Sequence, residues 1–160
     1  MAKVLHLFQA IAHGQPVREF DEVSAVENKG FKECIHGRPG KRQLLMMDSE
    51  TLEEFGIVPG QCKENITTRG IKLEGMPVGQ RMRIGEALLE VTKDCEPCHL
   101  MDAIRQGLQE ETRGRHGVLC RVVEAGRIRR SDQVEIVGKA SAKKTKTQVK
   151  AKTPVKRANK

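Results

Sequence analysis

The sequence predicts a mainly β protein, most simply a β-barrel with a few short inserted helices. Short stretches of alternating apolar residues recur along the chain, and turns containing Gly or Pro separate them at short spacing. Only two stretches carry a helical pattern. Many short strands with few helices are typical of barrels and sandwiches, and we expect a barrel here.

Strands are expected where apolar residues alternate between two turns. In the hairpin of the second half, Met82 and Ile84 alternate with arginines, and Gly85-Glu86 supplies a tight turn. The expected strands are 3–9, 20–26, 43–47, 62–68, 80–84, 87–92, 118–124 and 133–137.

Two helices are expected between these strands. Asp48 or Ser49 is a suitable N-cap for the first, which should run to Phe55 and stop at Gly56. The second should follow Pro97. Its expected core-facing residues, at helical spacing, are Leu100, Met101, Ile104 and Leu108.

The charge distribution divides the chain into one domain, 1–138, and a Lys-rich C-terminal tail, 139–160. The tail has eight lysines, one arginine and no acidic residue, whereas 1–138 has 20 basic and 21 acidic side chains. The formal net charge of +8 therefore comes from the tail. Because the tail has no apolar period, we expect it to be disordered and to make at most weak contact with polyanions.

The composition also indicates a cellular context. The sequence shows no export signal and no apolar stretch long enough to span a membrane, so we expect a cytoplasmic protein without membrane contact. Five cysteines, an odd number, fit reduced thiols better than a disulfide framework. Four Phe without Tyr or Trp leave few platforms for stacking single-stranded nucleic acid.

The Cys95-x-x-Cys98 turn is the main candidate for chemistry. Pro97 suits the start of a helix, so Cys98 should lie near the first turn, where free backbone N–H groups favour a thiolate. The residues alone leave four interpretations: two packed hydrophobes, a thioredoxin-like redox pair, a c-type haem attachment, or a metal or sulfur-transfer site. The β-rich surroundings disfavour the redox pair, and the missing export signal disfavours haem.

Two Gly-rich basic segments, 30–42 and 112–117, are candidate anion-binding loops, because glycines allow close approach and basic side chains supply donors. A structural zinc site is a further alternative, although Cys120 lies on an apolar strand face. Its ligands would be Cys95, Cys98, His116 and Cys120. Common hydrolase, metalloprotease and dinucleotide-binding motifs are absent.

Several longer motifs occur in order along residues 1–138. They are His36-Gly37-Arg38-Pro39-Gly40-Lys41-Arg42-Gln43, Pro59-Gly60, Glu64-Asn65-Ile66-Thr67-Thr68, Leu89-Glu90-Val91-Thr92, Cys95-x-Pro97-Cys98 and Gly114-Arg115-His116-Gly117. With these motifs the chain resembles the MOSC domain, the module at the C-terminus of molybdenum cofactor sulfurases and in small stand-alone bacterial proteins. One departure is Ser131, which precedes Asp132 where the family usually has Gly-Asp.

The resemblance implies a largely β-barrel fold that binds the molybdenum cofactor. It implies that Cys98 carries sulfur or ligates molybdenum, with Cys95 as a second catalytic candidate. The phosphorylated pterin of the cofactor suits the basic loops. The candidate cofactor-binding residues are His36, Arg38, Arg42, Asn65, Arg69 and Arg115.

The resemblance also implies partners. A separate cysteine desulfurase, which would carry pyridoxal phosphate, would supply the sulfur, and the cofactor or a molybdoenzyme would receive it. The alternative is an oxidoreductase component that retains the cofactor. Family members of that kind add an N-terminal domain that these 160 residues do not include, so we favour the sulfur carrier.

Overall fold

The computed structural model of the protein describes residues 1–139. The strands in this part are β1 (Lys3–Gln9), β2 (Arg18–Phe20), β3 (Glu22–Val26), β4 (Gly30–Phe31), β5 (Leu44–Asp48), β6 (Ile66–Arg69), β7 (Gln80–Ile84), β8 (Ala87–Asp94), β9 (Val118–Glu124), β10 (Gly126–Arg129) and β11 (Val134–Lys139). The helices are α1 (Ser49–Glu54), α2 (Leu100–Ile104) and α3 (Leu108–Glu111). The tail expected at 139–160 lies outside the described residues, apart from Lys139 at the end of β11.

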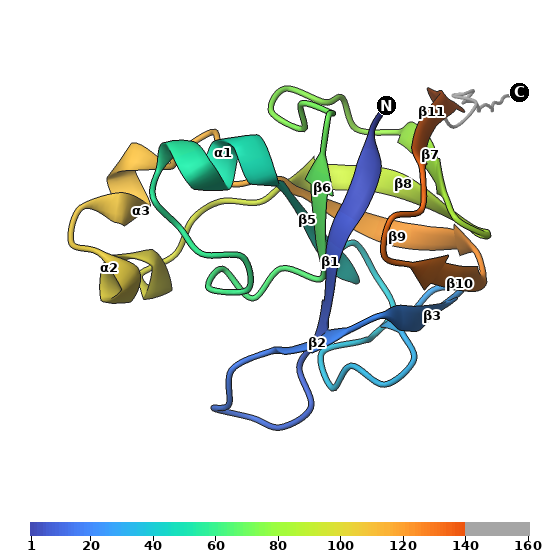
Figure 1. Ribbon diagram of the computed structural model, residues 1–160, viewed down its shortest axis with the longest axis horizontal. Coiled ribbons are helices and arrows are strands. Elements are labelled where there is room, and N and C mark those ends of the chain that lie inside the picture. The colour runs from blue at the N-terminus through green and yellow to red at the C-terminus, as the bar shows by residue number, and fades with distance from the viewer. Residues whose placement is uncertain (140–160) are drawn as a thin grey trace, which may run out of the picture.

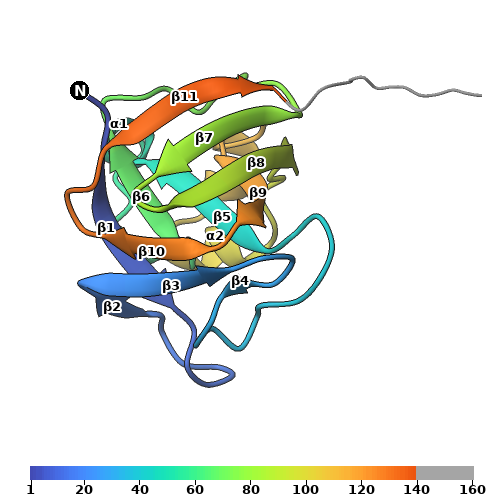
Figure 2. The ribbon, with the colours of Figure 1, turned by 90° about the vertical axis from the view of Figure 1, so that its right-hand side faces the viewer.

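The strands form two sheets, which confirms the mainly β class. The larger sheet has the order β11-β7-β8-β9-β5-β6-β1-β2, and the smaller one has the order β10-β3-β4. Neighbouring strands are antiparallel except β5 and β6, which pair in parallel. Figure 1 shows the three helices together at one end of the molecule, and Figure 2 shows β10 and β3 of the smaller sheet below β7 and β8 of the larger one.

The expected closed barrel is not confirmed, because the larger sheet ends in two free outer strands, β11 and β2. A short link joins the start of β1 to the residues before β11. Lys3 forms an isolated bridge with Gln133, and the Val4 amide donates to the Asp132 carbonyl at 2.8 Å. Figure 2 shows both sheets curved around one interior, and the strand order shows that the larger sheet does not close into a barrel.

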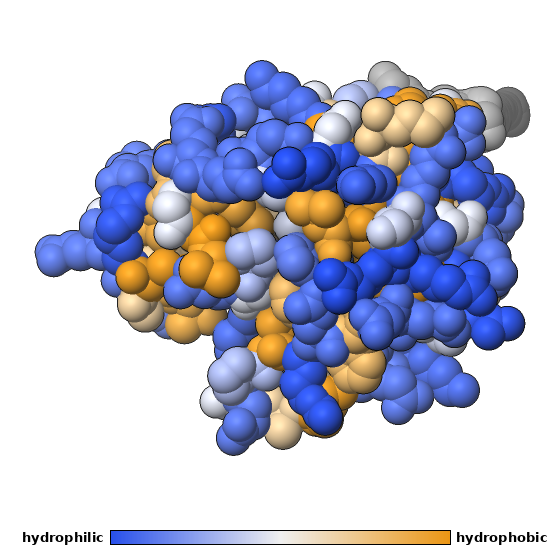
Figure 3. Space-filling model, viewed as in Figure 1, coloured by the Kyte–Doolittle hydropathy of each residue, from blue (hydrophilic) through white to orange (hydrophobic). Residues whose placement is uncertain are grey.

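Two clusters of buried hydrophobic residues hold these layers together. The larger one fills the space between the sheets and includes Leu7, Phe31 and Leu44. The smaller one joins the helices to β5 through Met47, Leu52, Ile57, Met101 and Leu108. Figure 3 shows hydrophobic residues reaching the surface at this helical end. Burial of these side chains, at about 25 cal/mol per Å², fixes the position of the helices.

The single helix expected after Pro97 is two short helices. Arg105 leaves the helical conformation with φ of −159° and ψ of 131°. The Asp102 carboxylate then accepts the amides of Gly107 and Gln109, and so supports the start of α3. Leu100, expected in the core, is 50% exposed, whereas the adjacent Met101 is buried.

Two further differences concern the β structure. The strand expected at 20–26 breaks at Asp21, so that β2 pairs with β1 in the larger sheet and β3 joins the smaller sheet. The short strands β4 and β10 have too few residues to show an alternation. In the part of the chain that the structure describes, no helix is long and apolar enough to cross a membrane.

Candidate functional site

The Cys95–Cys98 turn connects the end of β8 to α2. The Cys95 amide donates to the carbonyl of Gly117 at 3.3 Å, and the Met101 amide donates to the carbonyl of Cys98 at 3.0 Å. Cys98 therefore lies just before α2, whose N-cap is His99, rather than in its first turn. Cys95 is buried, whereas Cys98 is exposed.

Both cysteines line a cavity of about 430 Å³ at the helical end of the molecule. Its wall is partly apolar, and its polar groups include thiols, an imidazole and two basic side chains. The lining residues are Arg42, Leu45, Gln61, Cys62, Lys63, Cys95, Glu96, Cys98, Leu100, Met101, Ala103, Ile104 and His116. Cys62, a third thiol in this cavity, was not among the candidate residues, because its surrounding sequence carries no motif of its own.

Burial distinguishes two thiols of this cavity, Cys95 and Cys62, from the exposed thiol of Cys98. It raises the pKa of Cys95 to about 11, although the Arg42 charge acts in the opposite direction. It raises the pKa of Cys62 to about 12, with a smaller contribution from Glu64. Both are therefore protonated thiols at neutral pH. Cys98 is the accessible thiol of the set, and accessibility favours it as the nucleophile.

A second cavity of about 290 Å³ adjoins the first and shares Arg42, Leu45 and Lys63 with it. Its other lining residues are His36, Arg38, Gln43, Leu44, Asn65 and Leu119. Arg38, Arg42 and Lys63 form no ion pair with a carboxylate of residues 1–139. Because these three cations have no carboxylate partner in residues 1–139, the two adjoining cavities are suitable for an anionic ligand.

The loop that carries these cations is fixed at its base by Gln43. The Gln43 amide donates to Asn28 at 3.1 Å and to the Gly40 carbonyl at 2.9 Å, and its oxygen accepts the Val122 amide at 2.9 Å. Gly40 has φ of +116°, a conformation that side chains rarely adopt. The loop so fixed carries Arg38 and Arg42, which both line the second cavity.

His36 and Asn65, two other candidate residues that line the second cavity, differ in how far the fold already uses their polar groups. Partial burial and the charges of His13, Lys63 and Arg38 lower the pKa of His36, which favours the neutral imidazole at pH 7. Asn65 is committed to the fold. Its oxygen accepts the Leu45 amide at 3.0 Å, and its nitrogen donates to the Phe8 carbonyl at 3.2 Å.

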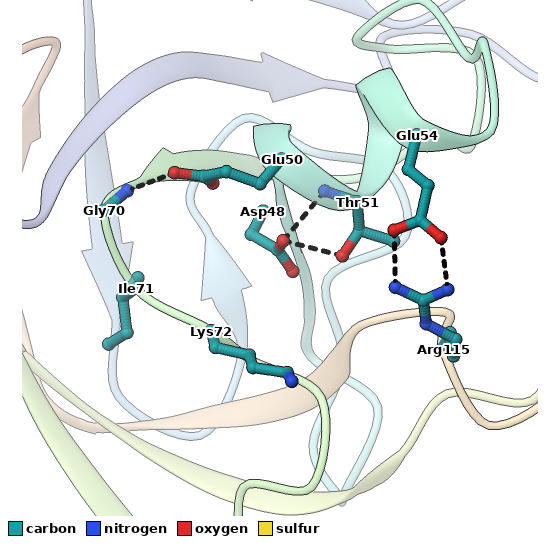
Figure 4. A pocket seen from close by; sticks show the side chains of 8 residues that line it. All are labelled: Asp48, Glu50, Thr51, Glu54, Gly70, Ile71, Lys72 and Arg115. Atoms are coloured by element: carbon teal, nitrogen blue, oxygen red, sulfur yellow. Dashed lines mark hydrogen bonds and ion pairs between the residues drawn. The ribbon is translucent and has the colours of Figure 1, made fainter.

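Arg69 and Arg115 lie away from these cavities. Arg69 donates to Glu53 at 3.1 Å. Arg115 donates to Glu54 at 2.7 Å and to Glu74 at 2.8 Å, and its guanidinium stacks 5.0 Å above the Phe55 ring. Figure 4 shows Arg115 paired with Glu54 beside α1. The guanidinium donors of Arg115 are thus already hydrogen-bonded to carboxylates.

The proposed zinc ligands are not brought together. Cys120 is fully buried between the sheets, with its sulfur 3.6 Å from that of Met46, whereas Cys95, Cys98 and His116 line the cavity. Within residues 1–139, no three or more His, Cys, Asp or Glu side chains are arranged to hold a metal ion. The cysteines of this part form no disulfide.

The fold matches solved structures at low sequence identity. YuaD from Bacillus subtilis matches with a TM-score of 0.75 and 16% identity, over 88% of this chain and 98% of that one. YiiM from Geobacillus stearothermophilus matches with a TM-score of 0.68 and 18% identity, over 86% and 75% of the two chains. YiiM from Escherichia coli gives 0.65 and 21%, over 87% and 71%.

The sequence comparisons give one clear result. No curated protein sequence matches the chain. The family model of the MOSC domain matches residues 35–135, which include the cysteine turn and both cavities. The protein therefore belongs to the MOSC domain family.

Proposed function

We propose that the protein binds the molybdenum cofactor and that Cys98 carries sulfur to its molybdenum or ligates it. One observation supports this most. The exposed thiol of Cys98 lines one of two adjoining cavities whose cations have no carboxylate partner among the described residues. Family membership connects the domain with this cofactor. The donor types fit the group, since molybdenum accepts soft sulfur ligands and a phosphate suits arginines.

In this proposal, Arg38, Arg42 and Lys63 bind the phosphate, while the partly apolar wall around Leu45 covers the pterin ring. The cofactor, when bound, supplies a molybdenum atom that accepts a sulfur ligand. Arg42 lines both cavities, so it connects the phosphate region to the thiol region. His36 can gain a proton once an anion offsets the cations around it.

Sulfur loading would occur at Cys98 itself. The Cys98 thiolate attacks the outer sulfur of a donor persulfide, forms a new S–S bond and releases the donor as a thiolate. A cysteine desulfurase is the proposed donor, and a molybdoenzyme or its cofactor is the proposed acceptor. Cys95 lies in the same cavity, but its raised pKa makes it a poor proton donor and a poor nucleophile, so the loading step depends on Cys98.

The test is the molybdenum content of the protein after incubation with excess isolated cofactor and gel filtration. Cys98→Ser should lose molybdenum or sulfur, whereas Cys34→Ser, a buried thiol outside both cavities, should behave as wild type. Stoichiometric and lasting molybdenum would favour the cofactor-retaining oxidoreductase, and release of the cofactor would favour the carrier. If the wild type retains molybdenum, equal retention by Cys98→Ser would refute ligation by this thiol; if the wild type releases the cofactor, equal sulfur loading of the two proteins by a desulfurase would refute the carrier role.

A further inference from the structure

A row of charged residues crosses the larger sheet and lies outside both cavities. In the strand register, Arg81 of β7 lies opposite Glu90 of β8, which lies opposite Arg121 of β9. On the other side of β7, Arg81 lies opposite Gly138 of β11. Figure 2 shows β11, β7, β8 and β9 side by side. Because neighbouring strands are about 4.8 Å apart, the row from Gly138 to Arg121 is about 14 Å long.

The two arginines of this row are only partly used by the fold. Each donates from Nε to the Glu90 carboxylate, at 2.9 Å from Arg81 and 2.8 Å from Arg121. Their terminal nitrogens donate to no group of residues 1–139. The Glu90 side chain is only 9% exposed, whereas those of Arg81 and Arg121 are 31% and 41% exposed. The row therefore presents two cations to solvent and largely covers the carboxylate between them.

A third cation extends the row beyond β9. A cavity of about 380 Å³ is lined by Glu90 and Arg121 on one side and by Lys41, from the loop before β5, on the other. A hydrogen bond from the Thr92 hydroxyl to the Lys41 carbonyl holds this loop against β8. Lys41 forms no ion pair with a carboxylate of residues 1–139. We call Arg81, Arg121 and Lys41 the basic stripe.

The other end of the basic stripe adjoins the start of the Lys-rich sequence. Gly138, opposite Arg81, is followed by Lys139 and then by residues 140–160, which lie outside the described part of the chain. Residues 140–160 contain seven lysines, one arginine and no acidic residue. The excess positive charge of the chain is therefore attached next to the stripe, while residues 1–138 as a whole are nearly neutral.

We propose that the basic stripe and residues 140–160 together bind the phosphate backbone of double-stranded DNA. Each DNA strand presents a charge about every 3.4 Å, so a row of about 14 Å can meet about four phosphates. A single strand is a poorer fit, because the chain has four Phe and neither Tyr nor Trp for base stacking. A specific protein partner is also a poorer fit, since the cavity beside the stripe has no aromatic residue in its lining.

The proposed surface is independent of the proposed cofactor site. The cavity that Lys41 and Arg121 line shares no residue with the two cavities assigned to the cofactor. Phosphate contacts carry no sequence information, so the affinity should not depend on the DNA sequence. Cys98→Ser should therefore bind DNA as wild type even where it loses sulfur loading, and failure of either proposal leaves the other standing.

The test is the fluorescence anisotropy of a labelled DNA duplex of about 20 base pairs, titrated with the full chain at about 50 to 200 mM NaCl. We expect a Kd of about 1–100 µM at about 100 mM NaCl, equal for two unrelated sequences. Lys41→Gln combined with Arg121→Gln should weaken binding at least about fivefold and lower the slope of log K against log[NaCl] by about 1.8.

The matched control combines Lys72→Gln with Arg113→Gln, which removes the same charge beside α1 and α3 and should bind within about twofold of wild type. Lys41→Gln alone breaks no ion pair of the described residues and should lower the slope by about 0.9, so the test holds even if Arg121→Gln unfolds the chain. Three results would overturn the proposal: no binding by wild type, equal weakening in the two double variants, or poly-glutamate competing as well as unlabelled duplex at equal charge. The last result would assign the stripe to an acidic protein.

Discussion

Arg115 donates two hydrogen bonds of 2.7 Å to the carboxylate of Glu54 and so ties the loop before β9 to helix α1. A third bond, 2.8 Å to Glu74, completes the arrangement and raises the pKa of the guanidinium further. Arg42, by contrast, has no carboxylate partner among the described residues and lines both cavities. The two arginines, both in basic Gly-rich loops, therefore lie in different surroundings, one paired with carboxylates and the other facing the cavities.

The first prediction compares these arginines. Arg42→Ala should weaken binding of the isolated cofactor by a charge-assisted hydrogen bond, about 1.5–3 kcal/mol, or roughly 10- to 150-fold in Kd. Its melting temperature should stay near wild type. Arg115→Ala should lower the melting temperature and leave Kd unchanged. Calorimetric titration and thermal melting of both variants check this, and a reversed pattern would place the phosphate beside α1.

The second prediction concerns the close approach of Gly117 to β5. A Cβ at Gly117 would meet the carbonyl oxygen of Met46 and the sulfur of Met47, and its φ is +70°. Gly114 has a similar φ, +79°, but open space around it. Gly117→Ala should thus cost about 2–4 kcal/mol of unfolding free energy, and Gly114→Ala about 1–2 kcal/mol. Urea denaturation checks this, and equal costs would remove the steric part of the argument.

The third prediction concerns the buried carboxyl group of Glu64. One oxygen accepts the Gly60 amide at 2.8 Å and the Thr67 hydroxyl at 3.0 Å, while the other has no partner in residues 1–139. Burial raises its pKa above the usual 4.5. The folded state therefore holds the proton more tightly, so this stabilisation is complete below pH 4.5 and is lost as pH rises through the folded value.

Glu64→Gln should flatten this dependence, because the amide does not ionise. The measurement is the free energy of unfolding in urea from pH 4 to pH 8. Glu27→Gln, at an exposed position, serves as the matched control and should follow the wild-type curve. A Glu64→Gln curve parallel to wild type would mean that this carboxyl does not titrate in the range.

Much of this arrangement could be predicted from the sequence, and the exceptions have physical causes. Alternation located β3, β7, β8 and β9, and the first helix cap at Asp48 is observed, with the Thr51 amide as donor. The motif containing Arg38 and Arg42 lies at the cavities that the cysteine turn also lines. These features depend on residues close together in sequence.

The exceptions depend on contacts between distant segments. Glu54 is 61 residues from Arg115, and no local pattern indicates that the two meet. The sulfur of Cys62 contacts that of Met101 in the cavity, although the two residues are 39 positions apart in the sequence. Ser131 has φ of 76°, which explains why a glycine would suit that turn. Gly107, at φ of 90°, was the available signal for the break between α2 and α3.

The assignment of Cys98 is the central claim, and a persulfide measurement tests it most directly. The reduced protein is incubated with a cysteine desulfurase and cysteine, and its intact mass is recorded without reductant. We predict one added sulfur atom in wild type, located on Cys98 by peptide mapping. Cys95→Ser should keep most of it, because Cys95 is a buried and protonated thiol. Cys98→Ser should show none while its melting curve remains cooperative. Full sulfur loading in folded Cys98→Ser would contradict the assignment.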